Sequence, residues 1–160
     1  MNKNIFTIIL VVTVGLLQIL LMPIISVYSA VPNLILIGAI LLILLDYEKE
    51  AFLLAGVGGL LLDFFSPIFF GFITIYLILI VFLLRYLVKK IFPSINILIV
   101  AGVTFIFAVI LSLLMNLFLK EQLSIIFLLT SGVYNAILAV VVFSIYNVSH
   151  QKLKLIKIKG

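Results

Sequence analysis

Asp63 stands apart from the polar turns that hold the other acidic residues, so it is the first side chain to examine for chemistry. Gly56 and Gly59 precede it, and about 100° of rotation per helical residue brings all three to one face. A carboxylate on such a face predicts recognition of a partner or substrate. The alternative is that it caps the Ser66–Pro67 turn or the start of the next helix.

Residues for catalysis are scarce in the rest of the chain. It has no Cys and one His, His150, at the end of the last apolar segment. The sequence offers no carboxylate pair, Ser–His or Ser–Lys dyad, or glycine-rich loop joined to Lys, although catalysis needs such constellations. We therefore expect no enzyme activity, no cofactor and no metal site. A membrane enzyme acting on lipid is the weakest alternative.

A few polar residues interrupt the apolar segments. Gln18 lies in the first segment, while Ser112 and Asn116, and likewise Ser131 and Asn135, are spaced four residues apart on one helix face. Hydrogen bonds between helices in lipid contribute about 0.6–2 kcal/mol each. We expect these side chains to join helices; a ligand-lined cavity is the alternative.

The composition explains why helices must position these residues inside a membrane. The 160 residues are 67% hydrophobic and 9% charged, whereas globular proteins carry about 25% charged residues. Charge-free gaps cover residues 4–45, 51–62, 64–84, 91–119 and 122–151. Roughly 20 apolar residues span a hydrocarbon core about 30 Å thick. This excludes a soluble enzyme, a nucleic-acid-binding module and a disordered tail.

We predict an all-α membrane protein whose single polytopic domain covers residues 1–160. Prolines and charged turns divide the chain into six membrane-spanning helices. The predicted helices are residues 5–22, 34–45, 51–65, 68–84, 95–119 and 123–149, followed by a basic tail at 150–160. We expect the first helix to remain uncleaved.

The basic residues predict the orientation. Six crossings place nine of the ten Lys and Arg residues on one side, with Lys120 opposite. Because positive residues collect on the cytoplasmic side, both termini are expected to be cytoplasmic. The tail lysines Lys152, Lys154, Lys157 and Lys159 are predicted to anchor on anionic lipid, at about 1 kcal/mol each. Binding of a cytoplasmic partner is the alternative for this tail.

One ordered set of motifs resembles a known family. The set is Leu17–Gln18, Pro23, Val31–Pro32–Asn33–Leu34, then Gly59–Leu60–Leu61–Leu62–Asp63–Phe64–Phe65–Ser66–Pro67 and Gly71. It resembles the MreD family of bacterial rod shape-determining proteins, whose members have similar length, hydrophobicity and six helices. The Gly–Leu–x–x–Asp–x–x–Ser–Pro … Gly segment, which ends at Gly71, is the most specific part. The sequence departs from the family at Asn33, where many members have Asp.

The resemblance implies a non-enzymatic scaffold of the cell-elongation machinery in the bacterial inner membrane. Such a scaffold binds MreC, a coiled-coil membrane protein, and helps couple MreB filaments to peptidoglycan synthesis and rod shape. It also implies the six-helix fold of the S components of energy-coupling-factor transporters. The residues then expected to bind the partner or pack helices are Gly56, Gly59, Asp63, Ser66, Pro67, Gly71, Gln18, Pro32 and Asn33.

A transporter S component that binds a small vitamin-type solute is the main alternative. S components usually dock on their partner through alanine-rich faces of the first helix. Residues 5–22 contain no Ala and only one Gly, Gly15, which disfavours this function.

Overall fold

The computed structural model describes residues 3–91, 95–120 and 124–159, and these residues form an all-helical fold without a strand. The helices are α1 (Lys3–Leu20), α2 (Leu34–Leu44), α3 (Glu48–Leu53), α4 (Gly59–Phe65), α5 (Phe72–Ile91), α6 (Ile97–Leu119) and α7 (Ile125–Lys159). A π-helical turn at Leu54–Gly58 joins α3 and α4 into one continuous rod, so the described chain has six main helical segments. The predicted all-α class is confirmed.

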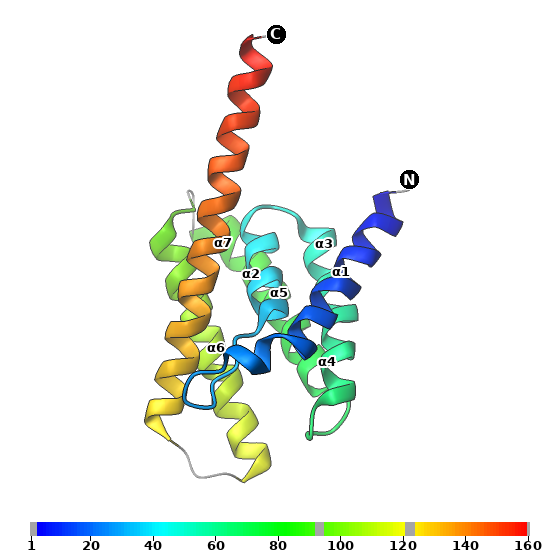
Figure 1. Ribbon diagram of the computed structural model, residues 1–160, viewed down its shortest axis with the longest axis vertical. Coiled ribbons are helices and arrows are strands. Elements are labelled where there is room, and N and C mark those ends of the chain that lie inside the picture. Colours follow the sequence, from blue (N-terminus) through cyan, green and yellow to red (C-terminus); the bar gives the residue numbers. More distant parts are fainter. Residues whose placement is uncertain (1–2, 92–94, 121–123, 160) are drawn as a thin grey trace.

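The helices run alternately up and down (Figure 1). The N- and C-terminal ends lie at one end of the bundle, together with the turn between α2 and α3. The turn between α4 and α5 lies at the opposite end. We call these the terminal end and the opposite end of the bundle.

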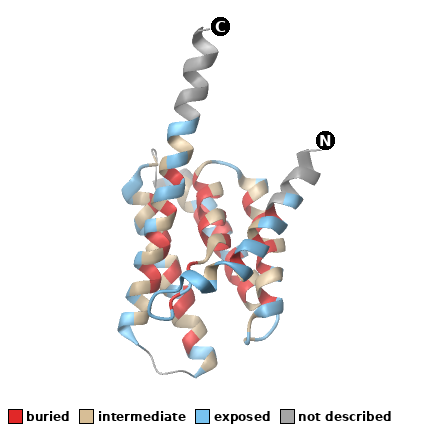
Figure 2. Ribbon diagram, in the orientation of Figure 1, coloured by how far each residue is buried: buried red, intermediate tan, exposed pale blue. Residues whose placement is uncertain are grey.

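α2 forms the centre of the core, as the buried residues in Figure 2 show. Its sequence has no polar face, and eight of its 11 residues are buried. Asn33 begins the helix, because its side-chain oxygen accepts a hydrogen bond from the Leu36 N–H at 2.9 Å. A short helix can be enclosed on all sides only if it carries apolar residues around its whole circumference.

Among the described residues, two helices are long and apolar enough to cross a membrane, judged by length and composition: Ile97–Leu119 and Ile125–Ser149. Three shorter apolar helices, Val11–Leu20, Leu34–Leu44 and Phe72–Val88, fall below the length of a full crossing. Six helical segments therefore match the predicted number of helices, whereas six membrane crossings stay a prediction.

Several helix ends differ from the predicted ones. The predicted turn at 46–50 ends earlier, because α3 begins at Glu48 and places Glu48 and Glu50 in its first turn, where the helix dipole favours acidic residues. The predicted helix 68–84 is instead α5, which starts at Phe72 and runs to Ile91, beyond the predicted end at residue 84. Within it, the Arg85 Nε donates to Glu48 Oε2 at 2.9 Å, which joins α5 to α3.

The first and the last two helices also differ at their ends. α1 ends at Leu20, two residues before the predicted end, and a 3-10 turn, Met22–Ile25, follows it around Pro23. α6 starts at Ile97, capped by the Asn96 side chain. α7 continues to Lys159, so the predicted tail is helical through that residue.

Candidate functional site

Asp63 caps the start of α5. Its side chain is 4% exposed. Oδ1 accepts the Ile73 N–H at 2.8 Å, and Oδ2 accepts the Thr74 N–H at 3.1 Å and the Thr74 hydroxyl at 2.5 Å. The first N–H groups of a helix have no partner within the helix, and a carboxylate there also matches the dipole. Both carboxylate oxygens are therefore engaged by α5.

Gly59 lies at the closest approach of α4 to α5. A Cβ atom at this position would lie 2.7 Å from the Thr74 Cα. Since backbone cannot move aside as a flexible side chain can, this contact requires glycine. Gly56 differs, because a Cβ there would meet nothing within 4 Å. The sequence predicts one shared face for the two glycines. In the structure Gly59 is packed against α5, whereas the position of Gly56 is open.

The turn after α4 completes this unit. Ser66 ends the helix, and its hydroxyl accepts the Ile68 N–H at 3.3 Å. Pro67 is exposed, and Gly71 adopts a positive φ of 95° just before α5, a conformation that favours glycine. We call Gly59, Asp63, Ser66, Gly71 and their partner Thr74 the α4–α5 junction.

Gln18 holds the entrance of α2. Its side chain is 7% exposed. Its Nε2 donates to the Pro32 carbonyl at 2.9 Å, and its Oε1 accepts the Leu34 N–H at 2.6 Å. The Asn33 N–H donates to Asn135 Oδ1 at 2.8 Å. The structure thus brings Gln18, Pro32 and Asn33 together. In the sequence, all three precede the residues of the α4–α5 junction.

The two predicted polar pairs meet between α6 and α7. The hydroxyls of Ser112 and Ser131 lie 2.6 Å apart. Asn116 Nδ2 donates to the Ser112 carbonyl at 3.0 Å, and Asn135 Nδ2 donates to the Ser131 carbonyl at 2.8 Å. All four side chains are buried. Together with Gln18 and Asn33 they form what we call the polar network, which links α1, α2, α6 and α7.

The segment between α1 and α2 is mostly exposed, since Ile24 and Tyr28 are each 76% exposed, and only Ala30 and Pro32 near its end are buried. The Tyr134 hydroxyl donates to the Ile25 carbonyl at 2.7 Å, next to the Asn33–Asn135 contact. Asn135 is ten residues into α7, which places this contact about 15 Å from the start of that helix. Side chains of α1 and α7 therefore hold the non-helical backbone by hydrogen bonds, and only its end next to α2 is enclosed by the molecule.

A cavity of about 220 Å³ adjoins the polar network. Its polar lining consists of Ser29, Asn33, Ser112, Ser131 and Asn135. None of its lining residues is charged. Such a volume has room for several waters, at about 30 Å³ each, or for one small neutral molecule.

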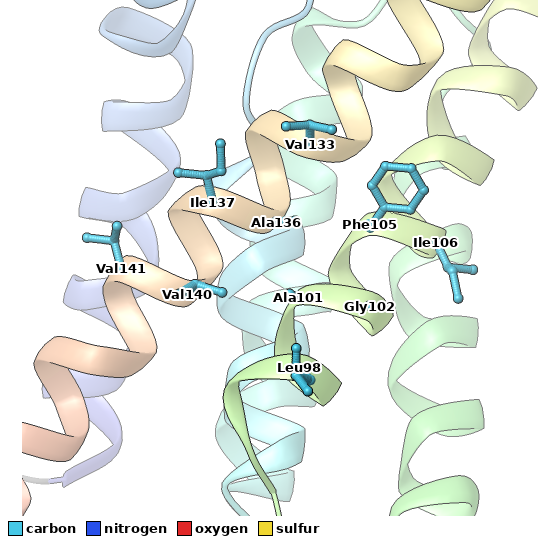
Figure 3. Close-up of a pocket in the computed structure, with 10 residues that line it drawn as sticks. All are labelled: Leu98, Ala101, Gly102, Phe105, Ile106, Val133, Ala136, Ile137, Val140 and Val141. Atoms are coloured by element: carbon cyan, nitrogen blue, oxygen red, sulfur yellow. The ribbon is translucent and has the colours of Figure 1, made fainter.

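A second, larger hollow is an apolar groove of about 630 Å³ between α6 and α7 (Figure 3). Both helices present residues at three- and four-residue spacings, the pattern of one helix face. These residues are Leu98, Ala101, Gly102, Phe105 and Ile106 of α6, and Val133, Ala136, Ile137, Val140 and Val141 of α7. A Cβ at Gly102 would meet nothing within 4 Å, so the packing of this chain does not require that glycine. We call this hollow the α6–α7 groove.

The sequence predicted the polar residues of the site but not all of the groups to which they hydrogen-bond. Thr74 and Tyr134 were not among the predicted site residues, although each makes a contact described above. A hydroxyl ten or so residues after a buried Asp, at the start of the next apolar segment, is a weak signal for such a cap. No local signal points from Tyr134 to Ile25, because 109 residues separate them.

The predicted lipid-anchoring lysines belong to the last turns of α7, and their side chains lie outside the described residues. Among the side chains that are described, no group of three or more His, Cys, Asp or Glu residues could hold a metal ion. Comparison of this chain with protein-family models, with curated proteins and with solved structures found no match in any of the three.

Proposed function

We propose that this chain is an MreD-like scaffold of the bacterial inner membrane. In this proposal it crosses the membrane six times with both termini cytoplasmic, and it binds a coiled-coil membrane protein of the MreC type. It thereby helps couple MreB filaments to peptidoglycan synthesis and rod shape. The anionic lipid of the cytoplasmic leaflet would hold the basic tail.

The observation that carries the proposal is the α4–α5 junction. The most specific segment of the resemblance contains Gly59, Asp63, Ser66 and Gly71, and these residues form one structural unit. Each of them fixes backbone geometry through packing, capping or a turn. A motif used in this way supports a scaffold more than an enzyme, because the carboxylate is occupied by α5.

The hydrogen bonds at the entrance of α2 agree with a membrane location. Lipid leaves no water to satisfy backbone groups, so they need partners in the protein. Here Gln18 bonds to the Pro32 carbonyl and the Leu34 N–H, and Asn135 accepts from the Asn33 N–H. The two long apolar helices and the common position of the two ends agree with this location.

The α6–α7 groove is the surface where we place the single membrane helix of the partner. Its walls are apolar, and two parallel rows of residues leave a furrow between them (Figure 3). The exposed Gly102 would let another backbone approach closely, as small residues do in lipid. A third helix would complete the packing that α6 and α7 begin.

Glycine-to-leucine variants test this surface without disturbing the core. Gly102→Leu fills the groove and Gly56→Leu fills the other open glycine position, and neither added Cβ meets an atom within 4 Å. Gly59→Leu is unsuitable, because it would strike the Thr74 backbone. The assay is co-purification of the MreC-type protein of the same organism, together with restoration of rod shape in a strain lacking MreD.

We expect Gly102→Leu to lose the partner and Gly56→Leu to retain it. If only Gly56→Leu fails to capture the partner, the partner binds the α3–α4 face instead. If both variants still capture the partner, neither surface is the partner site. If the unchanged chain neither captures the partner nor restores rod shape, the scaffold function itself is wrong.

A transporter S component remains the second candidate, since the 220 Å³ cavity beside the polar network could hold a small neutral solute. Saturable thermal stabilisation by one vitamin would support this function. It should then disappear in Ser131→Ala, which removes a hydroxyl from the cavity wall with little change in volume.

A further inference from the structure

A third hollow follows the central helix on the side where α1 and α7 separate. Towards their free ends α1 and α7 spread apart, with α2 visible between them (Figure 1). The hollow is about 340 Å³, and α2 forms its floor, with Val14 of α1 and Val142 of α7 among its walls. We call it the α2 groove.

The α2 groove is polar at one end and apolar along the rest. Tyr47 and Tyr146 line its terminal end, and their hydroxyl oxygens lie 3.4 Å apart. Tyr47 is 42% exposed, so this end of the groove is accessible. All the other lining residues are Val, Leu, Ile, Phe or Gly. An occupant that fits must be an amphiphile with one polar end.

The length of the floor matches one leaflet of a bilayer. The α2 residues along the groove run from Leu34 to Leu45, which is about 16 Å at 1.5 Å per residue. Half of a hydrocarbon core about 30 Å thick is about 15 Å. Tyrosine is also enriched at the membrane–water interface, where the polar part of a lipid lies.

We propose that the α2 groove binds one acyl chain of a glycerophospholipid from the cytoplasmic leaflet. The chain lies along α2, and one of the two hydroxyls of the Tyr47–Tyr146 pair, which hydrogen-bond to each other, donates to an ester or phosphate oxygen of the lipid. The α6–α7 groove has no polar group among its lining residues, so it lacks the anchor that selects a lipid. This inference rests on the membrane location in the proposed function and is independent of the partner.

The test uses the full chain in nanodiscs that contain phosphatidylglycerol with a photoreactive diazirine in one acyl chain. After illumination, mass spectrometry maps the labelled peptides. The key variant is Val142→Phe, which fills the α2 groove. Its matched control is Val141→Phe, because the neighbouring Val141 is 47% exposed against 44% for Val142 and lines the other groove.

We expect lipid label on residues 34–45 in the unchanged chain and in Val141→Phe, and a several-fold loss of it in Val142→Phe. The double variant Tyr47→Phe with Tyr146→Phe leaves the groove open. It should retain lipid through detergent washing several-fold less well, as expected for one lost hydrogen bond.

Two results would overturn the inference, and they differ from failure of the proposed function. Label on the exposed face of α5 but none on residues 34–45 would refute the groove while leaving the membrane location intact. Equal label on residues 34–45 in both Phe variants would also refute it. Absence of label from every helix would refute the membrane location, whereas partner capture has no influence on this assay.

Discussion

Removal of the Asp63 carboxylate should unfold the α4–α5 junction before it affects any partner. In Asp63→Ala, the N–H groups of Ile73 and Thr74 and the Thr74 hydroxyl lose their acceptor in a site that is 4% exposed. Hydrogen bonds to a charged group contribute about 1.5–3 kcal/mol each, and they are not additive. We therefore expect a loss of about 3–5 kcal/mol, near the upper limit for a single substitution.

Asp63→Asn separates the capping role from a charge-recognition role. The amide oxygen can replace one carboxylate oxygen, but the amide nitrogen cannot accept from Thr74. We expect about half the loss, about 1–3 kcal/mol. Ser66→Ala is the control at the same junction, because the Ser66 hydroxyl makes a longer contact of 3.3 Å. It should cost about 0.5 kcal/mol or less.

The assay is unfolding by SDS titration in mixed micelles followed by circular dichroism, since the sequence has no Trp for fluorescence. The outcome that would refute our reasoning is unchanged stability in both Asp63 variants together with loss of the MreC-type partner. In that case the carboxylate would serve recognition, and its contacts with α5 would be incidental.

Three further substitutions test the packing and the polar network in the same unfolding assay. Gly59→Ala places a Cβ 2.7 Å from the Thr74 Cα and should cost about 1–3 kcal/mol, whereas Gly102→Ala should be neutral or stabilising by up to about 1 kcal/mol; equal effects would contradict the close approach. Gln18→Leu leaves the Leu34 N–H and Pro32 carbonyl unpaired and should cost about 1–3 kcal/mol; unchanged stability would mean that these contacts do not hold the entrance of α2. A double-mutant cycle of Ser112→Ala and Ser131→Ala should give a coupling of about 0.6 kcal/mol or more, and a coupling near zero would mean that the 2.6 Å contact does not join the helices.

The sequence predicts a helix accurately where its boundary signals are local. The predicted 34–45 segment agrees with α2 within one residue, because Asn33 caps it from the adjacent position. The start of α5 is different. Its cap is Asp63, ten residues upstream of Ile73, so no local pattern marks Phe72 as the first helical residue. Only the packed arrangement of α4 against α5 determines that boundary.

The candidate site shows the same division between local and tertiary information. Four-residue spacing correctly placed Ser112 with Asn116, and Ser131 with Asn135, on common faces. It gave no information on which faces meet. The contact between Asn33 and Asn135 spans 102 residues, and a single sequence holds no periodicity that connects such distant positions.

That same contact determines the order in which the protein can be completed during synthesis. The central helix α2 lies in the first third of the chain, yet its entrance requires Asn135 from the last helix. At about 5–20 residues per second, the ribosome needs about 5–20 s to supply the intervening segment. During this interval the Asn33 N–H lacks its acceptor, the Asn135 side chain. The entrance of the innermost helix is therefore completed last, and a chain that stops before α7 lacks the acceptor for the Asn33 N–H.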